Sequence, residues 1–286
     1  MERLPVESPD DARIGEFVGL RERALRRGRR PADGRPLDAP TGRDGVFVAE
    51  GDVVVVRAVR AGYRLRALLV DATRTGPVPE GLPPGTPVYA AAPPVLERIT
   101  GLGVHRGLLG SFDRRPPPPA AEVLAGARRV AVLERVSNPA NLGVVLRSAH
   151  GLGIDAVLLD PGCTDPLYRR VSRVAMGEAY ALPWATVPDL PGGLDVVRAA
   201  GFRLVALTPA SGAIDLDRLD PAPDDRVALL LGAEGPGLSA ATLAAADVRA
   251  GIPMRAGVDS LNVGVAAGIA FWILGRRRAV PPVATI

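Results

Sequence analysis

The stretch GIPMRAGVDSLNVGVAAGIAFWILG, residues 251–275, decides the fold expected of this 286-residue chain. It opens with the apolar Ile252-Pro253-Met254, which we interpret as the end of a buried strand, and a polar loop follows. Ser260 suits a helix N-cap, and small and apolar residues then run from Val263 to Leu274. Such a helix can approach another backbone closely, so the pattern predicts either a buried core helix or a packing surface for a second subunit. It is too short and too rich in glycine for a membrane span.

Two more strand–loop–helix units lie upstream. Residues 227–231 (VALLL) form a predicted strand before the loop GAEGPG, 232–237, and a helix from Ser239. Residues 130–134 (VAVLE) form another, before the loop SNPANLG and its helix. Strands alternate with helices from here on, which predicts an α/β fold with a parallel sheet and helices on both faces. Ligands of such sheets bind at the carboxyl ends of the strands, where the three loops fall.

In order and spacing, these three units resemble the SPOUT class of methyltransferases, in particular its SpoU (TrmH-type) family of RNA ribose 2′-O-methyltransferases. The resemblance covers roughly residues 120 to 286, and it implies S-adenosylmethionine as cofactor and a homodimer formed through the last helix. It also implies a C-terminal trefoil knot, in which the 252–262 segment is threaded past the 232–238 loop. The residues that carry it are Asn141, Gly143, Arg147, Gly232, Glu234, Gly235, Gly237, Ile252, Pro253, Ser260, Leu261, Asn262 and Val263.

The same resemblance implies the residues of the site. Gly232, Ile252 and Leu261 would hold the adenosine of S-adenosylmethionine, with Met254 as a further lining residue. The catalytic residues it implies are Asn141, Arg147, Glu234, Ser260 and Asn262.

Arg147 is often described in the family as the catalytic base. An arginine stays protonated in proteins and is therefore a poor base. We instead expect Arg147 to clamp the target phosphate and to stabilise negative charge developing on the ribose oxygen. Positioning of that oxygen in line with the methyl group should supply most of the rate. Asn141 is predicted to cap the helix that carries Arg147.

Two other functions compete with this interpretation. The loop GAEGPG could bind a dinucleotide, as in a nicotinamide-dependent reductase, but it follows a late strand and Pro236 interrupts the turn. A catalytically idle RNA-binding protein of the same fold is the other alternative. The intact Asn141, Arg147, Glu234 and Asn262 count against it.

Composition excludes several chemistries. Every one of the 35 basic residues is arginine, so neither a Schiff-base lysine nor a P-loop lysine is possible. The single Cys163 and the two histidines, His105 and His150, offer no metal-ligand spacing. We therefore expect a metal-free protein of the reducing cytoplasm. The charged, proline-containing residues 1–11 do not have the pattern of a signal peptide.

Positive charge gathers in the first part of the chain. Residues 1–115 hold 19 Arg and 15 Asp and Glu, a net charge of +4, whereas the remainder holds 16 of each. The cluster Arg26, Arg27, Arg29 and Arg30 is either part of a solvated helix and tail or a surface that contacts RNA phosphates.

The string FVAEGDVVVVRAVRAGYRLRALLV, residues 47–70, is similar to the L30e-like RNA-binding domain that often precedes this catalytic domain. The four valines favour a strand and the four-residue spacing of Val55, Val59 and Tyr63 favours a helix; the resemblance implies the helix. We predict a substrate-binding domain over 1–115, a proline linker over 116–121 and the methyltransferase domain over 122–286. Long relatives of this kind act mostly on large-subunit ribosomal RNA, so we expect 23S ribosomal RNA as substrate, with transfer RNA as the alternative.

Overall fold

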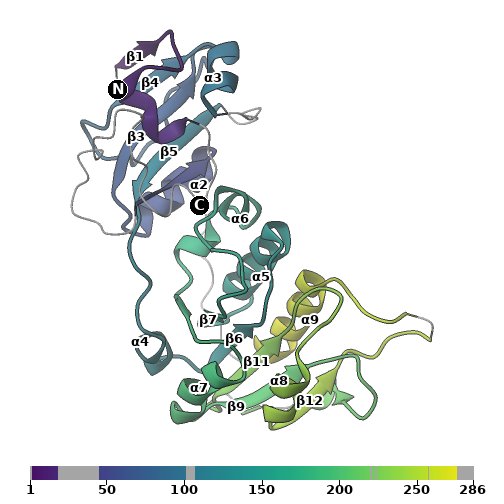
Figure 1. Cartoon of the computed structure of the whole chain (residues 1–286). Coiled ribbons are helices and arrows are strands. Elements are labelled where there is room, and N and C mark those ends of the chain that lie inside the picture. The colour runs from purple at the N-terminus through teal and green to yellow at the C-terminus, as the bar shows by residue number, and fades with distance from the viewer. Residues whose placement is uncertain are drawn as a thin grey trace. The chain divides into compact units, whose positions relative to one another are not determined.

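The computed structural model describes residues 2–18, 45–100, 107–219, 221–222, 224–256 and 258–275. The chain forms two compact units, shown in Figure 1: unit 1 comprises Met1–Pro116 with Leu167–Ala181, and unit 2 comprises Pro117–Pro166 with Leu182–Ile286. Residues 167–181 thus fall within the predicted methyltransferase domain in the sequence, and they pack with unit 1.

Unit 1 is built on a mixed five-stranded sheet in the order β1-β4-β3-β5-β2. β1, β3 and β4 run parallel, and β5 runs antiparallel to β2 and β3. The sequence did not predict β1, because RLPV is short, contains a proline and pairs only at the sheet edge, where proline is tolerated. The elements are β1 (Arg3–Val6), η1 (Ala12–Phe17), β2 (Val46–Glu50), α2 (Asp52–Arg60), β3 (Leu65–Asp71), β4 (Val88–Ala91), α3 (Pro93–Thr100), β5 (Leu108–Asp113), and from the second segment α6 (Arg169–Val174) and η2 (Glu178–Tyr180).

The valine-rich stretch after β2 is a helix, as the family resemblance implied. α2 begins after Gly51, whose φ of 94° turns the chain sharply away from the strand. Val54, Val55 and Ala58 then fall on one buried face of α2. Helical spacing of the buried positions, and not the strand preference of valine, decides the structure of this stretch.

Unit 2 is built on a parallel seven-stranded sheet in the order β10-β12-β9-β11-β6-β7-β8, with helices on both faces (Figure 1). The predicted fold class is confirmed. Because side chains alternate across a strand, Val130, Val132, Leu204 and Leu230 pack on one face with α4, α7 and α8. The elements are α4 (Ala120–Ala125), β6 (Arg129–Leu133), α5 (Pro139–Gly151), β7 (Ala156–Leu159), β8 (Trp184–Thr186), η3 (Gly192–Leu194), α7 (Asp195–Ala199), β9 (Arg203–Leu207), β10 (Ile214–Asp215), η4 (Leu216–Arg218), β11 (Val227–Leu231), α8 (Ala240–Ala245), β12 (Val248–Gly251) and α9 (Val263–Gly275).

The helix caps differ from the sequence prediction. Asn138, and not Asn141, caps α5, because its side chain accepts the amide of Ala140 at 2.9 Å. Asn262, and not Ser260, precedes α9 and accepts the amides of Gly264 and Val265. Both predictions chose a plausible cap residue two or three positions away from the true helix start. Asn141 lies instead in the first turn of α5.

Several other boundaries also differ from the prediction. The alternation of strands and helices in the sequence also predicts helices over 165–176 and 190–200; the first is the shorter α6, and the second divides into η3 and α7. The strands β8 and β10, of three and two residues, were not predicted because their patterns are too short to detect. The predicted linker over 116–121 ends in the first turn of α4, whose N-cap is Pro119.

The glycines of α9 allow it to pack directly on α5. A Cβ added at Gly264 would lie 2.7 Å from Cγ1 of Val144, and one at Gly275 would lie 2.2 Å from the carbonyl oxygen of Leu152. A side chain at Gly275 would collide with backbone, and one at Gly264 would require Val144 to shift. The opposite face of α9 is exposed, so the helix is both a core helix and an open surface. None of the helices in the described ranges combines the length and apolarity that a membrane span needs.

Candidate active site

A cavity of about 810 Å³ lies at the carboxyl ends of β9, β11 and β12. Its volume falls within the range of about 300 to 1,000 Å³ typical of small-molecule sites. Two segments that are separate in the sequence provide most of its wall, 231–238 and 252–263. This close approach of the two segments is the arrangement expected from the knot of the family, although the threading itself stays a prediction.

All four predicted cofactor residues line this cavity: Gly232, Ile252, Met254 and Leu261. Three of the predicted catalytic residues, Glu234, Ser260 and Asn262, line it as well. The wall therefore combines a glycine-rich backbone loop, apolar side chains and a few polar groups, which suits a nucleoside such as adenosine. Glu234 and Asp259 give it negative charge, which favours a cationic ligand.

The loop 232–237 is folded back tightly on itself. The amide of Gly237 donates to the carbonyl of Ala233 at 2.9 Å, and Gly235 and Gly237 adopt φ values of 84° and 70°. A Cβ at Gly232 would lie 2.1 Å from the carbonyl carbon of Gly237. Glycine at 232 is therefore a steric requirement, because backbone atoms cannot move aside as a flexible side chain would.

Asn141 and Asn262 join the first and third sequence motifs. Nδ2 of Asn262 donates to Oδ1 of Asn141 at 3.1 Å, while Oδ1 of Asn262 accepts the amide of Gly264 at 2.9 Å. The bond brings together the amino-terminal turns of α5 and α9. Both turns present partial positive charge, which favours an anionic group nearby.

Arg147 lies on the exposed surface of α5, outside the cavity lining. Within the described part of the chain, it makes no ion pair or hydrogen bond, so its guanidinium is free to bind a ligand. It follows Asn141 by six residues, which corresponds to about 9 Å along a helix. The structure thus places Arg147 on the same helix as Asn141 but apart from the cofactor cavity. The predicted RNA-contacting residues Arg26, Arg27, Arg29 and Arg30 lie outside the described residues.

Sequence reasoning missed two contributors to this site. The turn after β9, Thr208–Ala210, lines the cavity, and its signal was available, since β9 ends at the same edge of the sheet as the three loops considered. Glu134, at the end of β6, is 2% exposed, and its Oε2 accepts the amide of Ser239 at 2.9 Å. It ties the first motif to the start of α8. No sequence pattern indicates this bond.

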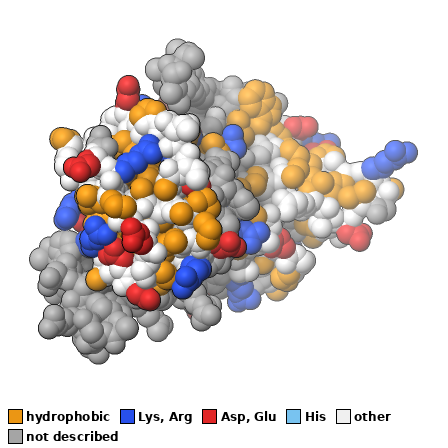
Figure 2. All heavy atoms as spheres, turned by 90° about the horizontal axis from the view of Figure 1, so that it is seen from above, with side chains coloured by type: hydrophobic (Ala, Val, Ile, Leu, Met, Phe, Trp, Pro, Cys, Tyr) orange, Lys and Arg blue, Asp and Glu red, His pale blue; other side chains and the backbone are white. Residues whose placement is uncertain are grey.

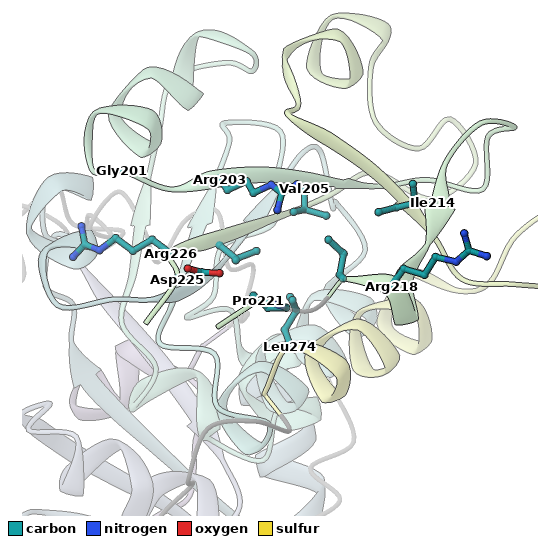
Figure 3. A pocket seen from close by; sticks show the side chains of 11 residues that line it. Gly201, Arg203, Val205, Ile214, Arg218, Pro221, Asp225, Arg226 and Leu274 are labelled. Carbon is teal, nitrogen blue, oxygen red and sulfur yellow. The ribbon is translucent and has the colours of Figure 1, made fainter. Parts of the chain in front are cut away.

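A second cavity, of about 520 Å³, lies at the amino ends of β9 and β11 and at the end of α9. In Figure 3, Arg218 and Arg226 extend away from it on opposite sides. The guanidinium of Arg226 stacks over Phe202 and donates to the carbonyls of Ala200 and Ala125, so it already serves the fold. The cavity at the carboxyl ends is therefore the candidate active site. In the described residues, no three or more His, Cys, Asp or Glu side chains gather where they could hold a metal ion.

The chain is similar to known proteins in sequence and in fold. The profile of the SpoU rRNA Methylase family matches residues 128–272. An uncharacterised tRNA/rRNA methyltransferase of Mycobacterium tuberculosis is 43% identical over 266 residues, covering 92% of this chain and 88% of that protein. The 23S rRNA (guanosine(2553)-2′-O)-methyltransferase of Bacillus subtilis is 29% identical over 229 residues, covering 80% of this chain and 88% of that enzyme. The crystal structure of an AdoMet-bound rRNA methyltransferase of Sinorhizobium meliloti superposes with a TM-score of 0.74 at 25% identity, covering 97% of this chain and 99% of that one.

Replacing Gly232 should weaken cofactor binding without unfolding the chain. We expect Gly232→Ala to weaken S-adenosylmethionine binding at least tenfold in titration calorimetry, because the new Cβ displaces the backbone at Gly237. Gly126→Ala is the matched control. Gly126, after α4, has a φ of −98° that any residue adopts, and an added Cβ there would meet nothing within 4 Å. Unchanged affinity in Gly232→Ala would show that the cofactor binds elsewhere.

Proposed function

This chain belongs to the SpoU rRNA methylase family of S-adenosylmethionine-dependent RNA ribose 2′-O-methyltransferases, and we propose that its substrate is 23S ribosomal RNA. One observation carries the site assignment. The loops 232–238 and 252–263 enclose one cavity, and Asn262, at the rim of α9, is bonded to Asn141 of α5. Residues of all three sequence motifs therefore lie near this edge of the sheet, Asn141 through its bond to Asn262 and the others in the cavity wall, and this supports the proposal.

We assign the roles as follows. S-adenosylmethionine, when bound, supplies a methyl carbon on a sulfonium. Gly232, Ile252, Met254 and Leu261 hold its adenosine, and the carboxylate of Glu234 favours the cationic sulfonium. Ser260, Asn141 and Asn262 orient the ribose. Arg147 binds the phosphate beside that ribose and stabilises the charge that develops on the attacking oxygen.

A substitution of Arg147 should affect RNA methylation but not cofactor binding. We expect Arg147→Ala to reduce methyl transfer at least a hundredfold, while the Kd for S-adenosylmethionine stays within threefold, because Arg147 lies outside the cavity. Tritiated methyl transfer and calorimetry measure the two. Arg203→Ala, an exposed arginine at the amino edge of the sheet, is the control and should change neither. Equal loss of both quantities in Arg147→Ala would mark the residue as structural.

The net positive charge of the chain lies almost entirely in residues 19–44. That segment contains eight Arg and four acids, so the rest of 1–115 contains 19 − 8 = 11 Arg and 15 − 4 = 11 acids, a net charge of zero. The described arginines of unit 1 are largely paired: Arg66 with Glu16 and Asp113, Arg74 with Asp52, and Arg13 with Asp11. On the face drawn in Figure 2, positive and negative side chains are interspersed. We therefore assign RNA attraction to the arginines of 19–44.

Changing Arg26, Arg27, Arg29 and Arg30 together to Ala should weaken RNA binding and flatten its salt dependence. The slope of log K against log[salt] falls by roughly 0.7 to 0.9 for each phosphate that is no longer neutralised. Filter binding across a salt series measures the slope. Arg13→Ala removes one arginine already paired with Asp11 and should leave the slope unchanged. An unaltered slope in the quadruple variant would place the RNA surface elsewhere.

These variants belong in the full chain and not in a truncated one. Residues 167–181 pack with unit 1, and Leu167, Val171 and Tyr180 are buried there. Removing 1–115 would expose them and confound the result. Mapping of ribose methylation in 23S ribosomal RNA and transfer RNA, from cells with and without this protein, distinguishes the two substrates. If neither RNA lacks a methyl group in cells without this protein, the catalytically idle alternative is favoured.

We also propose a homodimer formed through α5 and α9. These two adjacent helices expose large apolar side chains on the surface of unit 2: Val144, Val265, Ile269 and Trp272. Trp272 is 60% exposed, which is unusual for so large an apolar side chain unless it forms an interface.

Trp272→Glu should convert the dimer to a monomer, because it places a charge at the centre of this apolar surface. Light scattering coupled to size exclusion at micromolar concentration measures the mass. Val53→Glu is the control, since Val53 is an exposed apolar residue, 46% exposed, on α2 of unit 1. A wild-type monomer, or a Trp272→Glu dimer, would contradict the proposed interface.

A further inference from the structure

We propose that residues 160–181 form a positioning element that links the integrity of unit 1 to the geometry of the loop 133–138, which leads into α5, with Glu50 and Asp160 as its positioning residues. The part of this inference that concerns catalysis rests on the proposed function. The segment lies between β7 and β8, and its two halves serve different units. Residues 160–164 bind the loop that leads into α5, and residues 169–180 are held by β2 and α2 of unit 1.

The first half is hydrogen-bonded to the loop 133–138 at several points between Leu133 and Ser137. Asp160 is 4% exposed, and its Oδ1 accepts the amides of Arg135 at 2.9 Å and Gly162 at 3.0 Å. Sγ of Cys163 accepts the amide of Val136 at 3.3 Å. Four more hydrogen bonds join the same two segments: Asp160 N to Leu133 O, Cys163 Sγ to Leu133 O, Thr164 N to Val136 O, and Thr164 Oγ1 to Ser137 O.

These hydrogen bonds maintain an unfavourable backbone conformation at Arg135. Arg135 has a φ of 55°, in the left-handed region that residues other than glycine rarely adopt. Such a conformation persists only where the surroundings over-determine it. Here Gly162 packs against Arg135 so closely that a Cβ on Gly162 would lie 2.8 Å from Cγ of Arg135. Three residues further on, Asn138 caps α5. The turn at Arg135 therefore sets the position of the start of α5, the helix that carries Asn141 and Arg147.

The second half is held by a buried carboxylate. Glu50, at the end of β2, is fully buried, and it pairs with the guanidinium groups of Arg169 and Arg173, at 3.3 Å for the latter. A buried charge is tolerated only when it is paired, so the loss of either side leaves the other uncompensated. The methyl transfer assigned above makes no use of this group. Its role must therefore lie in holding α6.

α2 holds the rest of the second half. Arg57 donates to the carbonyl of Met176 at 2.6 Å and pairs with Glu178 at 2.6 Å. Gly177 packs on the helix so closely that a Cβ there would lie 3.1 Å from Cβ of Arg57. The ring of Tyr180 lies 5.4 Å from that of Phe47. Segment 169–180 is thus fixed in unit 1 by charge, backbone bonds and packing together.

Only four residues, 165–168, join the two halves in the sequence. If α6 is released from unit 1, residues 160–164 therefore become more mobile. The turn at Arg135, which they hold, then becomes more mobile as well. A chain whose unit 1 releases α6 should keep its cofactor cavity, because none of 160–181 lines it, and lose the ordered start of α5.

Glu50→Gln in the full chain tests the proposal, with Asp52→Asn as matched control. Asp52 lies only two residues away and forms a comparable ion pair with Arg74, but that pair ties α2 to the turn after β3 and does not hold 167–181. Hydrogen exchange of the amides of Arg135, Val136 and Thr164 is the first measurement. We expect about tenfold faster exchange in Glu50→Gln, since local opening governs exchange, and no change in Asp52→Asn.

Methyl transfer is the second measurement. We expect the kcat of Glu50→Gln to fall at least tenfold at saturating RNA, with the Kd for S-adenosylmethionine and the KM for RNA within twofold of the wild type. A merely structural role would lower stability and leave kcat unchanged. Arg173→Met, which leaves Glu50 paired with Arg169, serves if Glu50→Gln does not fold, and it should give a smaller change of the same kind.

The two measurements separate the possible failures. Faster exchange in 169–176 with unchanged exchange at Arg135 and Val136 would show that the halves are independent and would overturn the proposal. If the wild type methylates no RNA, the proposed function fails, and the exchange result alone still decides whether the segment links the two ends.

Discussion

The direct contact between α5 and α9 is the constraint on which the site depends. These helices come from the two ends of the methyltransferase unit in sequence, and Asn141 and Asn262 lie in or before their first turns. The two asparagines can share a hydrogen bond of 3.1 Å only because Gly264 and Gly275 let the helix backbones approach. A larger residue at Gly264 would require Val144 of α5 to shift, and one at Gly275 would meet the carbonyl oxygen of Leu152. Glycine, which weakens an isolated helix, is here the residue that allows the site to form.

All 35 basic residues of this protein are arginines, so arginine serves structural roles as well as binding roles. Arg129 shows the structural use most clearly: it is fully buried on β6, and its guanidinium donates to the carbonyls of Ala222, Asp225 and Leu274. A planar group with five donors can satisfy several carbonyls at once, which the single ammonium of lysine cannot do in a fixed geometry. Most described arginines of unit 1 likewise form ion pairs within the fold. Net charge by itself therefore says little about which arginines remain to attract a polyanion.

Sequence reasoning succeeded where local pattern and structure coincide. The parallel sheet follows from alternating strands and helices, and Gly232, Ile252, Met254 and Leu261 meet because strand ends converge at one sheet edge. It failed where the decisive partner is distant in sequence. β1 is a strand because β4 is beside it, and α6 packs with unit 1 through partners such as Glu50, which pairs with Arg169 and lies 119 residues earlier. The caps were misplaced because Asn138, Asn141, Ser260 and Asn262 are all suitable cap residues, and only the packed helices choose among them.

The separation between Glu50 and its two arginine partners also bears on how the protein is made. During synthesis β2 leaves the ribosome more than a hundred residues before α6. Glu50 therefore has neither of its partners, Arg169 and Arg173, until α6 has emerged. By then β6, α5 and β7 of the other unit have already emerged. Unit 1 therefore cannot complete its fold before the first part of the next unit has been made, whereas an amino-terminal domain ordinarily folds first. Its last piece arrives in the middle of its neighbour, and a graft that moved residues 1–116 to another enzyme would have to carry 167–181 with it.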